Sequence, residues 1–146
     1  MKIKFKKLDQ RAIVPCYETL GASGMDLHVL VDNSGEEVLK SYEIKLFRTA
    51  IAISLPEGYE AQVRSRSGLA LKNGLVVLNS PGTIDSDYRG EIGLIMMNCS
   101  KFDFTVKNGM RLAQLVVAKC ERAEIEIVSS LDSTDRNEGG FGSTGI

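Results

Sequence analysis

Several residue types on which enzymes often depend are scarce in this chain. Its 146 residues include no tryptophan, one histidine and three cysteines. The single histidine, His28, excludes a Ser-His-Asp or Cys-His catalytic arrangement unless it supplies the base itself, and its strand-like surroundings favour a structural or surface role. Cys16, Cys99 and Cys120 are odd in number and widely spaced, which favours reduced intracellular thiols over a disulfide framework or a zinc site.

A strong net charge and a long apolar run are absent as well. The formal net charge is −1 and the isoelectric point is about 5.9. These values argue against non-specific electrostatic binding to a nucleic-acid backbone, so any phosphate must be bound by a local group of residues. No run of about 18 apolar residues occurs, and the first residues show no apolar signal region. We therefore expect a cytoplasmic protein of one folded domain, without a membrane or a nucleic acid as a direct partner.

The chain does contain many short segments in which apolar and polar or small residues alternate. Turn signals such as Pro56-Glu57-Gly58, Ser80-Pro81-Gly82 and Asn108-Gly109 separate them. One short helix is predicted over 67–72, stopped by Asn73-Gly74. The pattern predicts an all-β sandwich or barrel with half-buried strands, among them segments at 3–5, 51–55, 59–63, 102–106 and 125–127.

The composition changes from about Ser133, and the last residues are rich in glycine. The stretch 139–145 combines four glycines with Phe141 and the hydroxyls of Ser143 and Thr144. Alone, it fits either a flexible polar terminus or a nucleotide-binding arm with backbone donors for phosphate and a ring for stacking on a base. Its literal match to G-x-G-x-x-G is not a dinucleotide fingerprint, because only Ile146 follows where a helix is needed.

Four further segments are richer in polar residues and glycine than a β-domain requires, and each also has a structural interpretation. In 22–27, Asp26 is a possible ligand or a turn cap. In 65–70, Arg66 suits phosphate, whereas Ser67 suits either phosphate or a helix N-cap. In 79–90, Asp85 and Asp87 fit a general base or a simple Asp-Ser-Asp turn.

The fourth of these segments, 108–115, places Arg111 and Gln114 in an otherwise apolar strand, where polar groups require partners. Taken in order, the five segments resemble the five motifs of the trimeric dUTPase family, the deoxyuridine triphosphate nucleotidohydrolases, over Ala22 to Gly145. The resemblance implies a distorted jelly-roll-like β-barrel or sandwich over 1–132, with one short helix, and a flexible glycine-rich arm over 133–146 that closes over the active site. It also implies a homotrimer with active sites at subunit interfaces.

The implied reaction is hydrolysis of dUTP to dUMP and pyrophosphate with Mg²⁺, which supplies dUMP for thymidylate synthesis and keeps uracil out of DNA. By the same resemblance, Asp85 would be the general base that orients water for attack on the α-phosphorus. Tyr88 would stack under the deoxyribose and leave no room for a 2′-hydroxyl. The uracil edge would be bound by Asn79, by the backbone of Thr83, Ile84 and Asp85, and by the strand near Gly93.

The remaining roles concern the phosphates, the metal and the arm. Gln114 would contact the α-phosphate region, and Asp26 would act at the metal through water. Arg136 would reach the γ-phosphate, and Phe141 would stack on uracil. The other phosphate contacts implied by the resemblance are Arg66, Ser67 and Gly68 from the body and Gly142, Ser143 and Thr144 from the arm.

Two positions depart from the family pattern. Met110 stands where an acid usually precedes the arginine, which puts a structural ion pair there in doubt, and Asn137 stands where a glycine is usual. Two other interpretations stay open: a dCTP deaminase of the same fold, alone or bifunctional, and a non-catalytic trimeric nucleotide-binding or regulatory module. The deaminase's Arg-Ser-Ser-x-Ala-Arg-type segment is absent from the chain.

Overall fold

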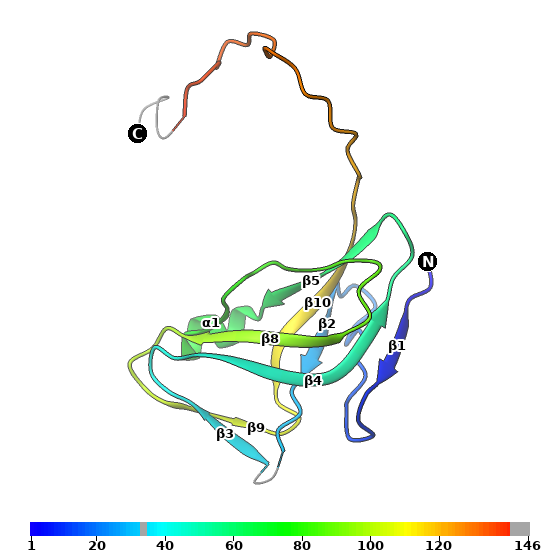
Figure 1. Cartoon of the computed structure of the whole chain (residues 1–146). Helices are drawn as coiled ribbons and strands as arrows, with labels where there is room; N and C mark the ends of the chain where they lie inside the picture. Colours follow the sequence, from blue (N-terminus) through cyan, green and yellow to red (C-terminus); the bar gives the residue numbers. More distant parts are fainter. Residues whose placement is uncertain (33–34, 141–146) are drawn as a thin grey trace.

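The computed structural model describes residues 1–32 and 35–140, and over these it has ten strands and one short helix (Figure 1). The sequence prediction of an all-β fold is confirmed. In chain order the elements are β1 Lys4–Lys7, β2 Gly24–His28, β3 Glu36–Leu39, β4 Ile44–Ser54, β5 Tyr59–Ser65, α1 Ser67–Asn73, β6 Leu75–Val77, β7 Gly82–Ile84, β8 Glu91–Asn98, β9 Phe104–Lys107 and β10 Arg111–Lys119.

The strands form two larger antiparallel sheets and a small one. Their orders are β1-β4-β8-β6, β2-β10-β5-β7 and β3-β9. Along β8 every second residue is buried, because successive side chains of a strand point to opposite faces. Leu94 and Met96 of β8 thereby share one core with Leu27 of β2 and Leu115 of β10. The result is a jelly-roll-like sandwich.

Helix α1 forms as the sequence predicts, but its first turn differs from one structural interpretation. Gly74 ends the helix with φ 68°, in the left-handed region that glycine tolerates, and its N–H donates to Ala70 O. At the other end, Arg66 occupies the N-cap position and no side chain caps the helix. The interpretation of Ser67 as the N-cap is wrong, because Arg66 is the last extended residue and Ser67 already has helical backbone.

Strand β4 is interrupted by a bulge. Its pairing with β8 shifts register between Arg48 and Ala52, and Ala50 has φ 53°. The half-buried alternation predicted for 51–55 is wrong here, since Ala50, Ile51, Ala52 and Ile53 are all buried. The bulge breaks the two-residue alternation of buried and exposed side chains. The alanines are buried easily because their side chain is only a methyl group.

The strand predicted at 125–127 is not formed. Strand β10 ends at Lys119, and residues 120–140 run away from the sheets without strand pairing (Figure 1). Ile125 and Ile127 are 88% and 95% exposed. A strand needs a partner for its backbone groups, and in this single chain nothing lies beside the segment. The domain boundary placed at 132 stays a prediction.

Among the described residues, no helix has both the length and the apolar character needed to cross a membrane.

Candidate active site

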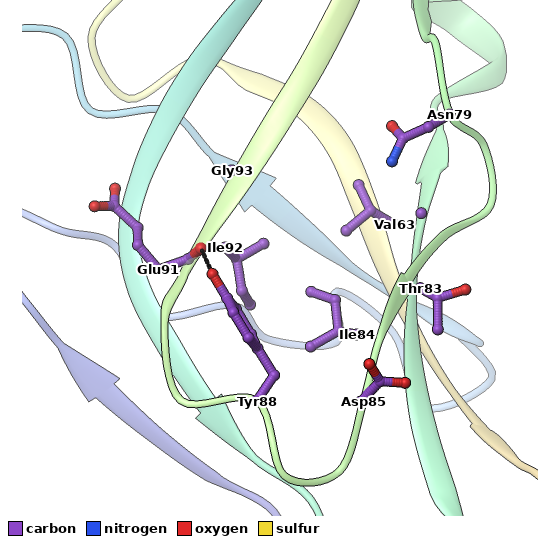
Figure 2. Close-up of a pocket in the computed structure, with 10 residues that line it drawn as sticks. Val63, Asn79, Thr83, Ile84, Asp85, Tyr88, Glu91, Ile92 and Gly93 are labelled. Carbon is purple, nitrogen blue, oxygen red and sulfur yellow. Dashed lines mark hydrogen bonds between the residues drawn. The ribbon is translucent and has the colours of Figure 1, made fainter.

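A cavity of about 190 Å³ opens between β5, β7 and the start of β8 (Figure 2). It brings together every body residue that the sequence analysis assigned to the base and the sugar: Asn79, Thr83, Ile84, Asp85, Tyr88 and Gly93. Apolar walls come from Val63 and Ile92. A small cavity that combines apolar walls with polar side chains and main-chain groups fits a planar polar ring.

The turn after β7 places the acid and the aromatic ring. Strand β7 ends at the buried Ile84, so Asp85 is the first residue outside the sheet, and it is exposed. Tyr88 N–H donates to Asp85 O at 3.2 Å, which closes the turn. The Tyr88 hydroxyl donates to Glu91 O at 3.1 Å.

Gly90 makes room for this ring. A Cβ atom at Gly90 would lie 2.2 Å from the Tyr88 hydroxyl oxygen. A larger residue at this position would force the Tyr88 ring to shift, so glycine allows the ring to pack against the main chain at the edge of the cavity.

A second cavity, of about 400 Å³, lies at the start of α1. It is lined by Asp26, Arg66, Ser67, Gly68 and Gln114, which are the body residues assigned to the phosphates and the metal, together with Leu69, Lys72 and Asn73. Two cationic side chains and a hydroxyl around one hollow suit an oxyanion group.

Asp26, which lines this cavity, connects two arginines, of which only Arg66 lines it too. Its Oδ1 lies 2.9 Å from Arg66 Nε and its Oδ2 lies 2.9 Å from Arg111 Nη1. Arg66 Nη1 also donates to Arg111 O at 2.9 Å. Arg111 thus has an ion pair with Asp26 although Met110 stands before it, and the effect of the missing acid stays open. The Asp26 side chain is 14% exposed, so these contacts hold the Arg66 guanidinium in one orientation at the cavity wall.

Gln114 faces the same cavity from β10. Its Nε2 donates to Ser65 O at 3.0 Å. A Cβ atom at Gly24, on the neighbouring β2, would lie 2.4 Å from Gln114 Oε1. The glycine at the start of β2 thus leaves space for the amide.

His28 lies beside this cluster but lines neither cavity. It pairs with Arg111 across β2 and β10. Among the described residues its Nδ1 has no hydrogen-bond partner, and burial lowers the pKa of the imidazole below its usual value. The arrangement favours a neutral ring, in keeping with the structural role expected for it.

The arm residues that the structure describes reach neither cavity. Arg136 Nε donates to Gly139 O at 2.7 Å, so its bond is local. Asn137 has φ 40°, the left-handed backbone that makes asparagine a tolerable replacement for glycine. Phe141, Gly142, Ser143 and Thr144, which were assigned to uracil and the phosphates, lie outside the described residues.

The sequence analysis missed three polar residues that line the cavities, of which Asn73 was named only as part of the helix stop. Lys72 lies one helical turn after Gly68, a spacing that could have placed it in the phosphate cavity. Glu91 directly follows the segment 79–90 but resembles an ordinary surface residue of an alternating strand. Nothing in the sequence marks its contacts with β4.

The comparisons with known proteins agree with this geometry. A family model described as dUTPase matches residues 10–145. The deoxyuridine 5′-triphosphate nucleotidohydrolase of Orientia tsutsugamushi (strain Ikeda) is 52% identical, with 100% of this chain and 99% of that protein covered. The protein of the same name from Syntrophotalea carbinolica is also 52% identical, with 99% of this chain and 97% of that protein covered.

Among solved structures, the Staphylococcus bacteriophage 80alpha dUTPase with dUPNHPP is similar with a TM-score of 0.88 at 26% identity, and 99% of each chain is covered. The fold, the motifs and the full-length relatives together define an all-β nucleotide hydrolase. The chain belongs to the dUTPase family.

Proposed function

We propose that the protein hydrolyses dUTP to dUMP and pyrophosphate by attack of an Asp85-activated water on the α-phosphorus. The observation that carries this proposal is the single cavity that unites Asp85, Tyr88 and the main chain of β7. In the cell the reaction would supply dUMP for thymidylate synthesis and keep uracil out of DNA. The three cysteines are free, which suits the cytoplasm.

Asp85 is suited to the role of general base by its position. Its exposed carboxylate borders both the small cavity and an adjoining groove, so water reaches it. The carboxylate accepts a proton from this water as the new oxygen–phosphorus bond forms, and the bond from the α-phosphorus to the bridging oxygen breaks. Pyrophosphate leaves with the electron pair of that bond.

Selectivity for deoxyuridine would come from the walls of the first cavity. The amides and carbonyls along 83–85 and the Asn79 side chain offer donors and acceptors to the uracil edge, and the small volume disfavours a 5-methyl group. The Tyr88 ring, packed on Gly90, would lie against the sugar and exclude a 2′-hydroxyl. The related phage enzyme was solved with dUPNHPP, which is consistent with such a ligand.

The second cavity would hold the triphosphate. Arg66, fixed by Asp26 and Arg111, offers its remaining N–H groups, and Lys72 adds a second positive charge. Ser67, Gly68 and Gln114 complete the lining. The leaving pyrophosphate would be stabilised by the same groups that bind it in the ground state.

Magnesium would be held chiefly by the triphosphate and water. Within the described part of the chain, no three His, Cys, Asp or Glu side chains gather to bind a metal directly. Asp26 already accepts from two arginines, but each oxygen retains a lone pair for a water. This donor set fits Asp26 acting through water on an ion that dehydrates reluctantly. The bound ion would neutralise phosphate charge during the reaction.

We further propose a homotrimer whose active sites lie between subunits. The outer face of the β1-β4-β8-β6 sheet exposes a patch of apolar side chains from neighbouring strands, namely Ile44, Leu46, Leu78 and Ile95. Leu46 also packs on Gly93, which links this patch to the first cavity. Covering it with further copies of the chain would remove the apolar surface from water and bring the first cavity of one subunit to the second cavity of another.

The test is a substrate comparison. We expect pyrophosphate release in the presence of Mg²⁺ to be fastest with dUTP, measured against dTTP, UTP and dCTP as competitors. A preference for any competitor contradicts the proposal. Ammonia released from dCTP would indicate the deaminase instead, and binding of dUTP without turnover would indicate a non-catalytic module.

The substitution Gly90→Ala should disturb the sugar site. The added methyl group would overlap the Tyr88 hydroxyl, so the ring must move. We expect kcat/KM for dUTP to fall by about tenfold to a hundredfold, as is common for small misplacements of positioning groups. Steady-state kinetics measure the effect. Gly21→Ala is the matched control, because nothing lies within 4 Å of its Cβ; equal kinetics in both variants would contradict the role of Tyr88.

A further inference from the structure

The β4 bulge contains a backbone conformation that its surroundings must hold in place. Ala50 is fully buried and has φ 53°, a region that residues other than glycine seldom adopt. Its N–H donates to Glu91 Oε1 at 2.7 Å, and its O accepts from Leu8 N–H at 2.8 Å. The carboxylate of Glu91 is therefore the acceptor that satisfies the buried amide of the bulge.

A second polar link lies next to the first. The Thr49 hydroxyl donates to Ile92 O at 2.6 Å and accepts from Ile51 N–H at 3.2 Å. The bulge is thus attached to the first two residues of β8. The link to Glu91 is through its side chain, and the link to Ile92 is through its carbonyl oxygen.

Those two residues are also walls of the first cavity. Figure 2 shows the Glu91 side chain pointing away from the cavity, while its carbonyl oxygen accepts the Tyr88 hydroxyl. Ile92 and Gly93 continue the same wall. Glu91 therefore makes two contacts on opposite sides of the chain: its carboxylate binds the bulge, and its carbonyl oxygen binds the Tyr88 hydroxyl. A shift of Glu91 would change both contacts.

We propose that Glu91 is a positioning residue for sugar selectivity. Its carboxylate holds the bulge and thereby fixes the carbonyl that receives the Tyr88 hydroxyl, so that the ring stays where it excludes a 2′-hydroxyl. The proposal rests on the proposed function, in which Tyr88 carries that exclusion. It adds a residue that touches neither the sugar nor the phosphates.

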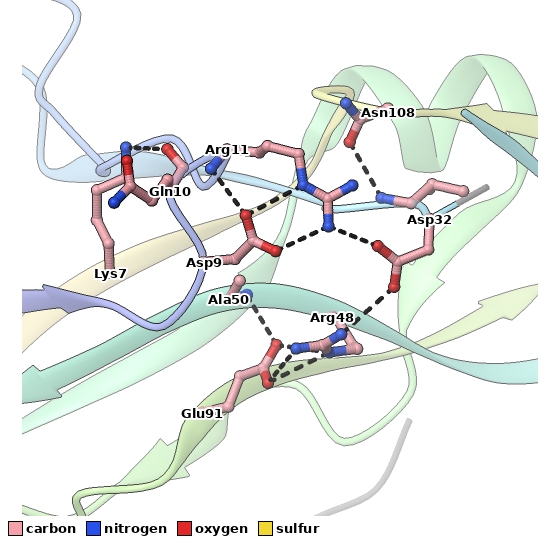
Figure 3. A network of polar contacts seen from close by, with 10 residues as sticks. Lys7, Asp9, Gln10, Arg11, Asp32, Arg48, Ala50, Glu91 and Asn108 are labelled. Carbon is pink, nitrogen blue, oxygen red and sulfur yellow. Dashed lines mark hydrogen bonds and ion pairs between the residues drawn. The ribbon is translucent and has the colours of Figure 1, made fainter. Parts of the chain in front are cut away.

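The Glu91 carboxylate also belongs to a wider polar network, whose outer members are too exposed to hold the bulge. Arg48 Nε lies 3.3 Å from Glu91 Oε1. From Arg48, further ion pairs connect Asp32, Arg11 and Asp9 in turn (Figure 3). The Arg48 and Asp32 side chains are 50% and 44% exposed at a separation of 3.4 Å, so solvent screens their attraction. Asp32→Asn is therefore a matched control that alters the network without reaching the bulge.

The experiment compares kcat/KM for dUTP with kcat/KM for UTP in folded, full-length variants. We expect Glu91→Ala to lower the dUTP:UTP ratio by about tenfold, because the Ala50 amide loses its acceptor and the Tyr88 ring gains freedom. Glu91→Gln keeps an oxygen acceptor and should restore most of the ratio. Asp32→Asn should leave the ratio unchanged. Where Glu91→Ala does not fold, Glu91→Asp, which is one methylene shorter, takes its place with an expected several-fold loss.

A dUTP:UTP ratio within twofold of the wild type in folded Glu91→Ala, or in Glu91→Asp used in its place, overturns the proposal. An equal loss in Asp32→Asn also overturns it, because the effect would then be general loosening. Failure of the proposed function is distinguishable: the unsubstituted protein would itself fail to prefer dUTP over UTP. A lower ratio in Glu91→Ala, with Glu91→Gln and Asp32→Asn close to the wild type, supports the positioning role.

Discussion

Replacing Asp85 by asparagine is expected to lower dUTP turnover by roughly 100- to 10,000-fold, the usual contribution of a general base. The amide keeps the size of the carboxylate but accepts no proton from water. Binding should persist, since the walls around Asp85 supply main-chain contacts that the substitution does not alter. Turnover is measured by pyrophosphate release, and binding by titration with a non-hydrolysable dUTP analogue.

Asp87→Asn is the matched control for this prediction. Asp87 lies two residues further along, is also exposed, and lines the adjoining groove but not the cavity that contains Tyr88. We expect near wild-type turnover from it. Retention of more than about a tenth of the activity in Asp85→Asn would rule out the general-base role.

The first cavity could be predicted from the sequence because most of its residues are clustered along it. Asn79 to Gly93 form one continuous stretch, so a tight turn between β7 and β8 necessarily gathers them. Asp26 and Gln114 are distant in the sequence but pair directly across β2 and β10. Composition alone does not predict that Asp26 and Gln114 lie side by side. That prediction came from the resemblance of the motifs.

The features that escaped prediction depend on contacts between distant segments. The role of Glu91 arises from a bulge opposite it in β4, and a left-handed alanine such as Ala50 has no signature in sequence. The pattern at 125–127 has the alternation of a strand, yet pairing requires a neighbour that a single chain does not offer. Alternation predicts the ability to pair, but it does not supply a partner strand.

Deletion of the chain from Asp135 onward is expected to abolish most turnover without unfolding the body. Within the described residues, the last strand ends at Lys119, and the hydrogen bonds of Thr134, Arg136 and Asn137 stay within 134–139. The deletion removes Arg136, proposed for the γ-phosphate, and Phe141, proposed to stack on uracil. The thermal midpoint should therefore stay unchanged while kcat/KM falls by about a hundredfold or more.

Single substitutions in the same segment separate these contributions. Phe141→Ala removes stacking alone, which is worth roughly 1–3 kcal/mol per base and corresponds to a loss of about fivefold to 150-fold. Glu138→Gln changes an exposed residue of the arm to which no role is assigned and should leave kcat/KM unaltered. If the truncated protein turns over dUTP at the full rate, closure by the arm is wrong. If Phe141→Ala equals the whole deletion, stacking is the arm's principal contribution and Arg136 adds little.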